Sequence, residues 1–193
     1  MALITESDLR TRARRAPDVM VRADSVLTER VRKQEQVETY DIFLSHAYED
    51  KELILGVVLT IEDLGFRVYV DWRDDSQLDR ARVTHETAAK LRKRMQSSRS
   101  LLYSTTAQAK NSKWMPWELG YKDGNGGRVA VLPVSARQSN SDEYSGQEYL
   151  GIYPYVTKDR NKKGDDKLWV HRSLTKYVVF DNWLKGEEPS EHP

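Results

Sequence analysis

Glu118 is the residue whose sequence surroundings best suit chemistry. It stands in the run SKWMPWELG, four residues after Trp114, so the two side chains share one face of the helix that this run predicts. An apolar flank from Trp114 and Trp117 would raise the pKa of the carboxyl group and strengthen its hydrogen bonds. The alternative is structural, because a glutamate near a helix start favours the helix dipole and tryptophans are common core residues.

Polar residues also follow each of four predicted strands. In an open parallel sheet, ligands bind beyond the carboxyl ends of the strands. The helix that carries Glu118 comes after the third strand, so it can face the same crevice as these residues. The set consists of Ser45 and His46 after the first strand, Asp71, Trp72 and Arg73 after the second, Ser104 after the third and Ser135 after the fourth.

The strands and helices that must position these residues begin with a βαβ unit. Residues 41–44 form a short apolar run, typical of a strand buried on both faces. The next helix has one apolar face, and Gly65 ends it. Residues 68–70 then give a second strand, and such short joints predict a right-handed parallel connection. The apolar face consists of Ile54, Val57, Val58, Ile61 and Leu64.

The same alternation continues along the chain. A helix is predicted through residues 88–95, a strand at 101–103, a helix at 114–121 and a strand at 129–134. The sequence therefore predicts an α/β fold with a central parallel sheet flanked by helices.

The two ends of the chain are predicted to lie outside this domain. Residues 1–38 are expected to form an N-terminal helical arm, starting at Thr5 and interrupted at Pro17, which packs on the domain or on a second copy of it. The domain itself is predicted at residues 39–185, followed by a disordered polar tail at 186–193. Within the domain, we expect a mobile loop at 135–151, strands at 152–156 and 168–171, and a closing helix at 181–184.

Composition excludes several classes of protein and site. The 193 residues contain 31 Lys and Arg against 30 Asp and Glu, so bulk charge does not favour nucleic acid or an anionic membrane as a partner. No apolar run approaches the roughly 20 residues that span a bilayer, and the first residues lack a secretory signal. The absence of cysteine excludes disulfides and thiol nucleophiles, and no histidine has metal-ligand partners at useful spacing. We therefore expect a cytoplasmic protein.

Three sequence blocks, in this order, resemble the motifs of a TIR domain. They are YDIFLSHAYED at residues 40–50, LGFRVYVDW at 64–72 and NSKWMPWELG at 111–120. The resemblance implies a flavodoxin-like TIR fold, with Glu118 at the position of the family's catalytic glutamate in its Trp-x-x-x-Glu helix. Residues 73–79 lack the Pro-Gly pair of many adaptor-type TIR domains, which weakens an adaptor interpretation.

Many TIR domains cleave the bond between nicotinamide and ribose in NAD. The resemblance implies that Glu118 accepts hydrogen bonds from the ribose hydroxyls and stabilises an oxocarbenium-like transition state. Aromatic groups such as Trp72 or Trp114 could stack on a base ring, and Ser45, His46 and Arg73 could hold phosphate or ribose. Asp71 joins this substrate-binding set by its position. NAD would be the substrate, and we expect neither a cofactor nor a metal ion.

The chain further resembles the stand-alone bacterial TIR proteins of the Thoeris anti-phage system. In that system the TIR protein makes a cyclised or conjugated ADP-ribose signal for a separate effector. The resemblance also implies TIR–TIR self-association on activation, with no nucleic-acid or membrane partner. Two alternatives stay open, namely a non-catalytic TIR scaffold and a nucleoside deoxyribosyltransferase, which also places a carboxylate at a ribose.

Overall fold

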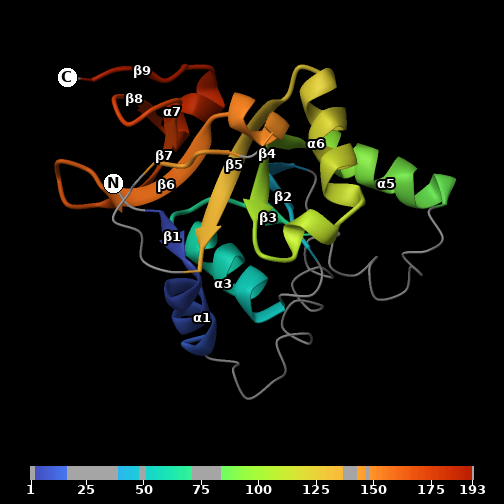
Figure 1. Cartoon of the computed structure of the whole chain (residues 1–193), viewed down its shortest axis with the longest axis horizontal. Coiled ribbons are helices and arrows are strands. Elements are labelled where there is room, and N and C mark those ends of the chain that lie inside the picture. Colours follow the sequence, from blue (N-terminus) through green and yellow to red (C-terminus); the bar gives the residue numbers. More distant parts are fainter. Residues whose placement is uncertain are drawn as a thin grey trace.

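The computed structural model describes residues 3–16, 39–47, 51–70, 84–136, 143–146 and 148–192. Within these ranges the strands form one nine-stranded sheet in the order β3-β2-β4-β5-β6-β7-β8-β9, and β1 pairs with β5 beside this path (Figure 1). None of the helices in the described ranges is long and apolar enough to cross a membrane.

Five of the six parallel strands in the described ranges lie on the main path of the sheet. These are β2 (Tyr40–Ser45), β3 (Val68–Tyr69), β4 (Ser98–Thr105), β5 (Arg128–Ser135) and β6 (Tyr155–Arg160). Their spatial order, β3-β2-β4-β5-β6, is the flavodoxin-like order in which the first strand of the motif lies between the second and the third. The predicted α/β fold with a parallel sheet is therefore confirmed.

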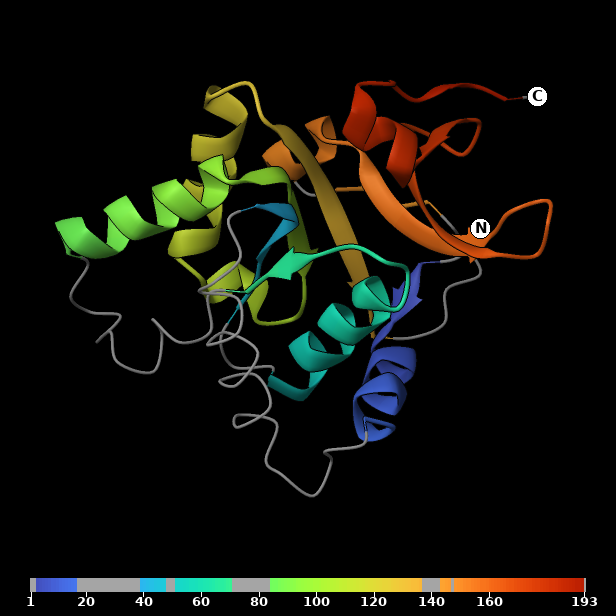
Figure 2. The same cartoon turned by 180° about the vertical axis from the view of Figure 1, so that it is seen from behind.

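Helices cover both faces of the parallel strands. Helix α3 (Lys51–Glu62) lies on one face, while α5 (His85–Gln96) and α6 (Trp114–Gly124) lie on the other (Figures 1 and 2). Successive strand residues point to opposite faces, so Leu102 belongs to the core under α3 whereas Leu101 and Tyr103 belong to the core under α5 and α6. As predicted, α3 ends before Gly65, which has a φ of 90°. Short 3₁₀ helices η1 (Ala109–Asn111) and η2 (Glu148–Ile152) precede α6 and β6.

The N-terminal segment is part of this core. Strand β1 (Ile4–Thr5) pairs with the end of β5, and α1 (Glu6–Arg14) follows. Thr5 caps the helix as predicted, because its side chain accepts a hydrogen bond from the backbone of Asp8 at 3.2 Å. Leu9 is buried in the same cluster as α3, so residues 3–16 pack on the domain. Pro17 and the rest of the predicted arm lie outside the described residues.

The contact between α1 and α3 is unusually close. A Cβ atom at Gly56 of α3 would lie 2.1 Å from the carbonyl oxygen of Leu9, so only glycine fits there. Arg10 and Arg14 of α1 donate to the carboxylate of Glu52, at 3.0 and 2.8 Å. The bond with Arg14 makes the largest contribution to a lowered pKa of Glu52. Residues 3–16 of the predicted arm are thus held against the domain by both packing and charge.

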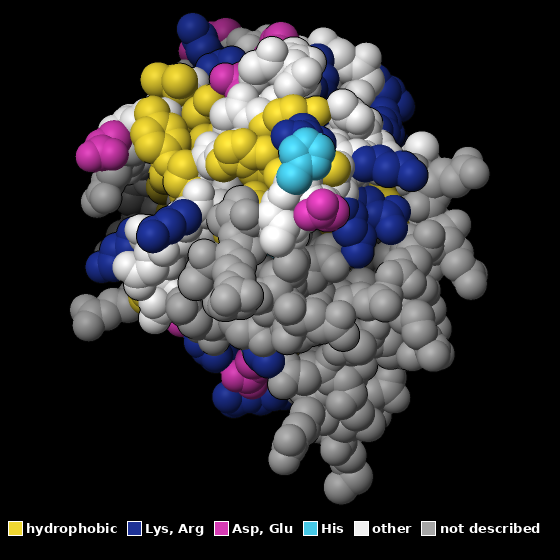
Figure 3. Space-filling model, turned by 90° about the vertical axis from the view of Figure 1, so that its right-hand side faces the viewer, with side chains coloured by type: hydrophobic (Ala, Val, Ile, Leu, Met, Phe, Trp, Pro, Cys, Tyr) yellow, Lys and Arg dark blue, Asp and Glu magenta, His cyan; other side chains and the backbone are white. Residues whose placement is uncertain are grey.

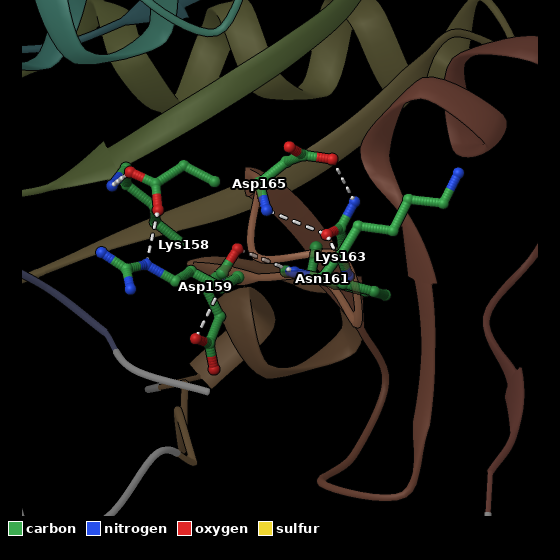
Figure 4. A network of polar contacts seen from close by, with 8 residues as sticks. Lys158, Asp159, Asn161, Lys163 and Asp165 are labelled. Atoms are coloured by element: carbon green, nitrogen blue, oxygen red, sulfur yellow. Dashed lines mark hydrogen bonds and ion pairs between the residues drawn. The ribbon is translucent and has the colours of Figure 1, made fainter.

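The C-terminal part extends the sheet with antiparallel strands. Strand β7 (Asp166–His171) returns beside β6, and β8 (Lys176–Val179) and β9 (Ser190–Glu191) follow. The turn between β6 and β7 is closed by Asn161, whose Oδ1 accepts from the backbone of Lys163 and Asp165 at 2.8 and 3.0 Å (Figure 4). The two strands and this turn therefore form an ordered hairpin.

The chain end differs from the predicted disordered tail. Helix α7 (Phe180–Lys185) stops at Gly186, which has a φ of 115°, and β9 then pairs with β8. The ring of His192 stacks on Tyr177 at 4.2 Å, and its backbone nitrogen donates to Thr175 at 2.7 Å. These contacts order a polar segment. It has too few apolar residues for the sequence to predict a strand there. Of the predicted mobile loop at 135–151, residues 137–142 and 147 lie outside the described part.

Candidate active site

Strands β2 and β4 are neighbours whose following helices lie on opposite faces of the sheet. The chain leaves β2 toward α3 on one face, and it leaves β4 toward α6 on the other. In open α/β sheets such a switch point, at the carboxyl ends of the strands, is where ligands bind. The residues at the ends of these two strands therefore define the place to look for a site.

Ser45 and Glu118 meet at this place. Ser45 is the last residue of β2 and is 1% exposed, and Glu118 on α6 is 7% exposed. The Oγ of Ser45 donates a hydrogen bond to the Oε2 of Glu118 at 2.6 Å. A bond to a carboxylate is short and strong, and burial strengthens it further. The fold thus brings together two residues 73 positions apart, both of which were predicted site residues.

The packing of α6 explains why Glu118 points inward. Met115 and Leu119 are buried in the core under α5 and α6, and Glu118 lies beside Leu119 on the inner side of the helix. Trp114 and Trp117 are only partly buried and contact each other edge to face, with ring centres 5.4 Å apart. Figure 3 looks onto the side of the molecule where α5 and α6 lie and shows exposed hydrophobic side chains there. A stacking role for Trp114 stays a prediction.

Tyrosines complete the surroundings of Glu118. Tyr103 on β4 is the register partner of Ser45 and is 4% exposed. Burial is the main cause of a strongly raised pKa for Tyr103. The neighbouring hydroxyl of Tyr149, which is hydrogen-bonded to Tyr103, raises this pKa further, and so does the charge of Glu118. Burial also raises the pKa of nearby Tyr144. Tyr103 and Tyr144 therefore stay protonated at neutral pH and can donate hydrogen bonds.

Sequence reasoning missed these tyrosines. Tyr103 was assigned only to a strand, because a tyrosine within an apolar run looks like core. Its position opposite Ser45 follows from the register between β2 and β4, which local patterns do not specify. Tyr144 and Tyr149 fall in the stretch predicted as a loop, and nothing in their local sequence marks them.

His46 is placed on the other face of the sheet. Phe43 and Ala47 belong to the core under α6 whereas Leu44 belongs to the core under α3, so alternation directs His46 toward α3. The Nδ1 of His46 lies 3.0 Å from the carbonyl oxygen of Leu44, which can only accept, so this nitrogen carries the proton. Strand alternation therefore assigns His46 to the α3 side, whereas Ser45 and Glu118 meet on the α6 side.

Two hydroxyl groups share the face of His46. By strand alternation Ser104 and Thr106, at the end of β4, point to the same side as Leu102, and both residues are buried. Within the part of the chain that the structure describes, neither side-chain oxygen has a hydrogen-bond partner. Because buried polar groups are normally satisfied, these hydroxyls are suited to bind a ligand.

The remaining predicted residues divide into two groups. Ser135 ends β5 and is paired in register with Thr5 of β1, which covers that strand end. Asp71, Trp72 and Arg73 lie outside the described residues. Among the residues that are described, no three His, Asp or Glu side chains gather closely enough to hold a metal ion.

Comparison with known proteins agrees with this arrangement. No family model matches the chain. The chain is 44% identical over 192 residues to the "Probable 3' cyclic ADP-D-ribose synthase ThsB'" of Bacillus cereus (strain MSX-D12), covering 96% of this chain and 99% of that protein. It is also 34% identical over 83 residues to the "Putative cyclic ADP-D-ribose synthase TIR2" of Cytobacillus dafuensis. This match covers 42% of the present chain and 22% of that protein. The chain therefore belongs to the TIR domain family and, within it, to the ThsB′ proteins of the Thoeris system.

Proposed function

We propose that this chain cleaves the nicotinamide–ribose bond of NAD and forms a cyclic ADP-ribose signal for bacterial anti-phage defence. The observation that carries the proposal is the buried 2.6 Å hydrogen bond between Ser45 and Glu118 at the switch point of the sheet. The name of the ThsB′ relative supports the same reaction class, since it describes a 3′ cyclic ADP-D-ribose synthase that matches this chain over nearly its whole length.

Glu118 would act by stabilising the ribose as positive charge develops on it. Nicotinamide leaves as a neutral molecule, so no acid has to protonate it, and the transition state resembles an oxocarbenium ion. A carboxylate has about four acceptor positions, so Glu118 can keep the bond from Ser45 while it accepts from ribose hydroxyls. Ser45 thus fixes the direction of the carboxylate before the substrate arrives.

Cyclisation requires that water does not reach the ribose carbon first. A hydroxyl of the same NAD molecule would attack this carbon, nicotinamide would leave with the electrons of the broken bond, and the hydroxyl proton would be released. The buried surroundings of Glu118, with Tyr103 beside Ser45, favour such an internal acceptor. The same site would make ADP-ribose wherever water enters.

The other substrate contacts are proposed by position. On the α3 side, the hydroxyls of Ser104 and Thr106 offer donors for phosphate or ribose oxygens, and His46 is proposed to contact a ribose hydroxyl. Trp114 is proposed to stack on a base ring, as is Trp72 in the segment that also holds Asp71 and Arg73. Self-association on activation and a separate effector that receives the nucleotide belong to the same proposal.

The first test uses the purified chain, NAD and mass spectrometry. We expect release of nicotinamide together with a product that has the mass of cyclic ADP-ribose, which is one water lighter than ADP-ribose. Glu118→Gln keeps the size and hydrogen-bonding capacity of the side chain but removes its charge, so the rate should fall about 1,000-fold. Unchanged circular dichroism and melting temperature would show that the fold is kept. Full activity in Glu118→Gln would contradict the proposed role of this carboxylate.

A further inference from the structure

Lys122 is a buried charged residue one helical turn beyond Glu118 on α6. It is only 8% exposed, and burial lowers its pKa. Its ammonium group donates to the carbonyl oxygens of Met95 at 2.8 Å and Ser98 at 2.5 Å. These carbonyls belong to the last turn of α5 and the first residue of β4, where the end of a helix attracts a cation. Lysine is seldom buried, so this placement indicates a specific role.

The turn after α6 is shaped around the stem of this lysine. A Cβ atom at Gly127 would lie 2.6 Å from the Cε and 2.7 Å from the Cδ of Lys122. The amide of Gly127 also donates to the carbonyl oxygen of Lys122 at 2.9 Å. One side chain therefore joins the end of α5, the start of β4, the helix α6 and the turn that follows it.

These bonds control how α6 is rotated about its own axis. Residues four apart lie on one side of a helix, so a rotation that moved Lys122 would move Glu118 as well. The other inward contacts of α6, through Met115 and Leu119, are apolar and have little directional preference. At the start of α6, the Oγ of Ser112 accepts from the backbone nitrogen of Met115 at 3.3 Å, and at the surface Gln96 donates to Tyr121. The bonds of the Lys122 ammonium group are buried directional contacts one turn from Glu118, and they join α6 to both α5 and β4.

We propose that Lys122 is a positioning residue, which keeps Glu118 in hydrogen-bond contact with Ser45 by fixing the rotation of α6. The expected effect of Lys122 on kcat rests on the proposed function, whereas its effect on the orientation of Glu118 does not.

The kinetic test compares Lys122→Met with Lys122→Arg. Methionine keeps the apolar stem but removes the ammonium, and we expect kcat for nicotinamide release to fall about 10- to 100-fold with KM within about threefold of wild type. Arginine retains a donor cation and should recover most of the loss. As a control, Gln96→Ala removes an exposed bond between the same two helices, from Gln96 to Tyr121 at 2.8 Å, and should leave kcat unchanged. A lower melting temperature with wild-type kcat in Lys122→Met would overturn the proposal.

Gly127→Ala provides an independent disturbance should Lys122→Met fail to fold. The added methyl group would displace the lysine stem and lower kcat in the same direction, whereas Gly124→Ala, with open space around its new Cβ, should not. Wild-type kcat in a folded Gly127→Ala variant would contradict the proposal.

A measurement that does not depend on NAD cleavage separates the role of Lys122 from the proposed function. In protein labelled with ¹³C-glutamate, the carboxyl signal of Glu118 is identified by its loss in Glu118→Gln. Lys122→Met should shift this signal and its titration in the same direction as Ser45→Ala does. If the wild-type chain failed to cleave NAD, the proposed function would fall while this measurement still decided the role of Lys122. An unchanged Glu118 signal in Lys122→Met would refute it.

Discussion

At the carboxyl ends of β2 and β4, the two faces of the sheet carry polar groups in very different arrangements. On the α6 side, Ser45 is bonded to a carboxylate and faces a buried tyrosine, so its polar groups are arranged around a charge. On the α3 side, the hydroxyls of Ser104 and Thr106 have no partner in the described part of the chain, and His46 turns back to its own strand. The ends of the two strands thus supply a pre-organised site on one face and, on the other, two hydroxyls that make no hydrogen bond within the described residues. The first arrangement suits catalysis, and the second suits binding.

The largest effect on the α3 side should be on stability. Gly56→Ala places a methyl group 2.1 Å from the Leu9 carbonyl oxygen, so α1 and α3 must move apart. Overpacking of this kind costs about 2–3 kcal/mol of unfolding free energy. Gly120→Ala is the matched control, because the same change in α6 meets open space and should be neutral or stabilising. Chemical denaturation of both variants measures the difference, and equal stabilities would show that the helix contact is not as tight as described.

The contrast between the faces should appear in the kinetics of Ser45→Ala and His46→Asn. Losing a hydrogen bond to a charged group costs about 1.5–3 kcal/mol, so Ser45→Ala should lower kcat about 10- to 100-fold. Asparagine can still donate to the Leu44 carbonyl, so His46→Asn should raise KM for NAD about threefold with little change in kcat. Steady-state kinetics of both variants measures these effects. A loss of kcat in His46→Asn would show that the α3 face takes part in catalysis and not only in binding.

The smallest expected effect is a pH-dependent one at Glu52. Its pKa is lowered in the folded chain, chiefly by the bond with Arg14, so the ion pair stabilises the fold above the unfolded pKa. This stability is lost as pH falls through the lower, folded pKa. The carboxylate is 35% exposed and screened by solvent, which keeps its contribution below about 1 kcal/mol. Glu52→Gln should therefore be slightly less stable than wild type at pH 7, and the difference should shrink as the pH is lowered in a series of thermal melts.

The sequence was sufficient for the parallel strands between residues 41 and 134 but not for which of their residues share a face of the sheet. Short joints and a glycine at residue 65 predict the parallel βαβ unit, because only a right-handed crossover packs well. Ser45 and His46, however, are neighbours in sequence that point in opposite directions, and a shift of one residue in register would exchange them. Position beyond a strand therefore predicted a site without predicting which residues share it.

Lys122 and β1 show two further limits. A lysine in a charged helix is normally exposed, and its two carbonyl partners come from elements that only the tertiary fold brings near. A strand of two residues is too short to show a periodic pattern, so residues 4–5 were assigned to the arm. Both features depend on contacts that are distant along the chain.

The pairing of β1 has a consequence for how the protein is made. Ile4 and Thr5 leave the ribosome about 130 residues before their partners, Val134 and Ser135. Residues 4–5 must wait with their backbone groups unpaired while the βαβ unit between β2 and β3 can already form from local contacts. This early-synthesised strand is thus among the last to pair, because its partner strand β5 must emerge before it can do so.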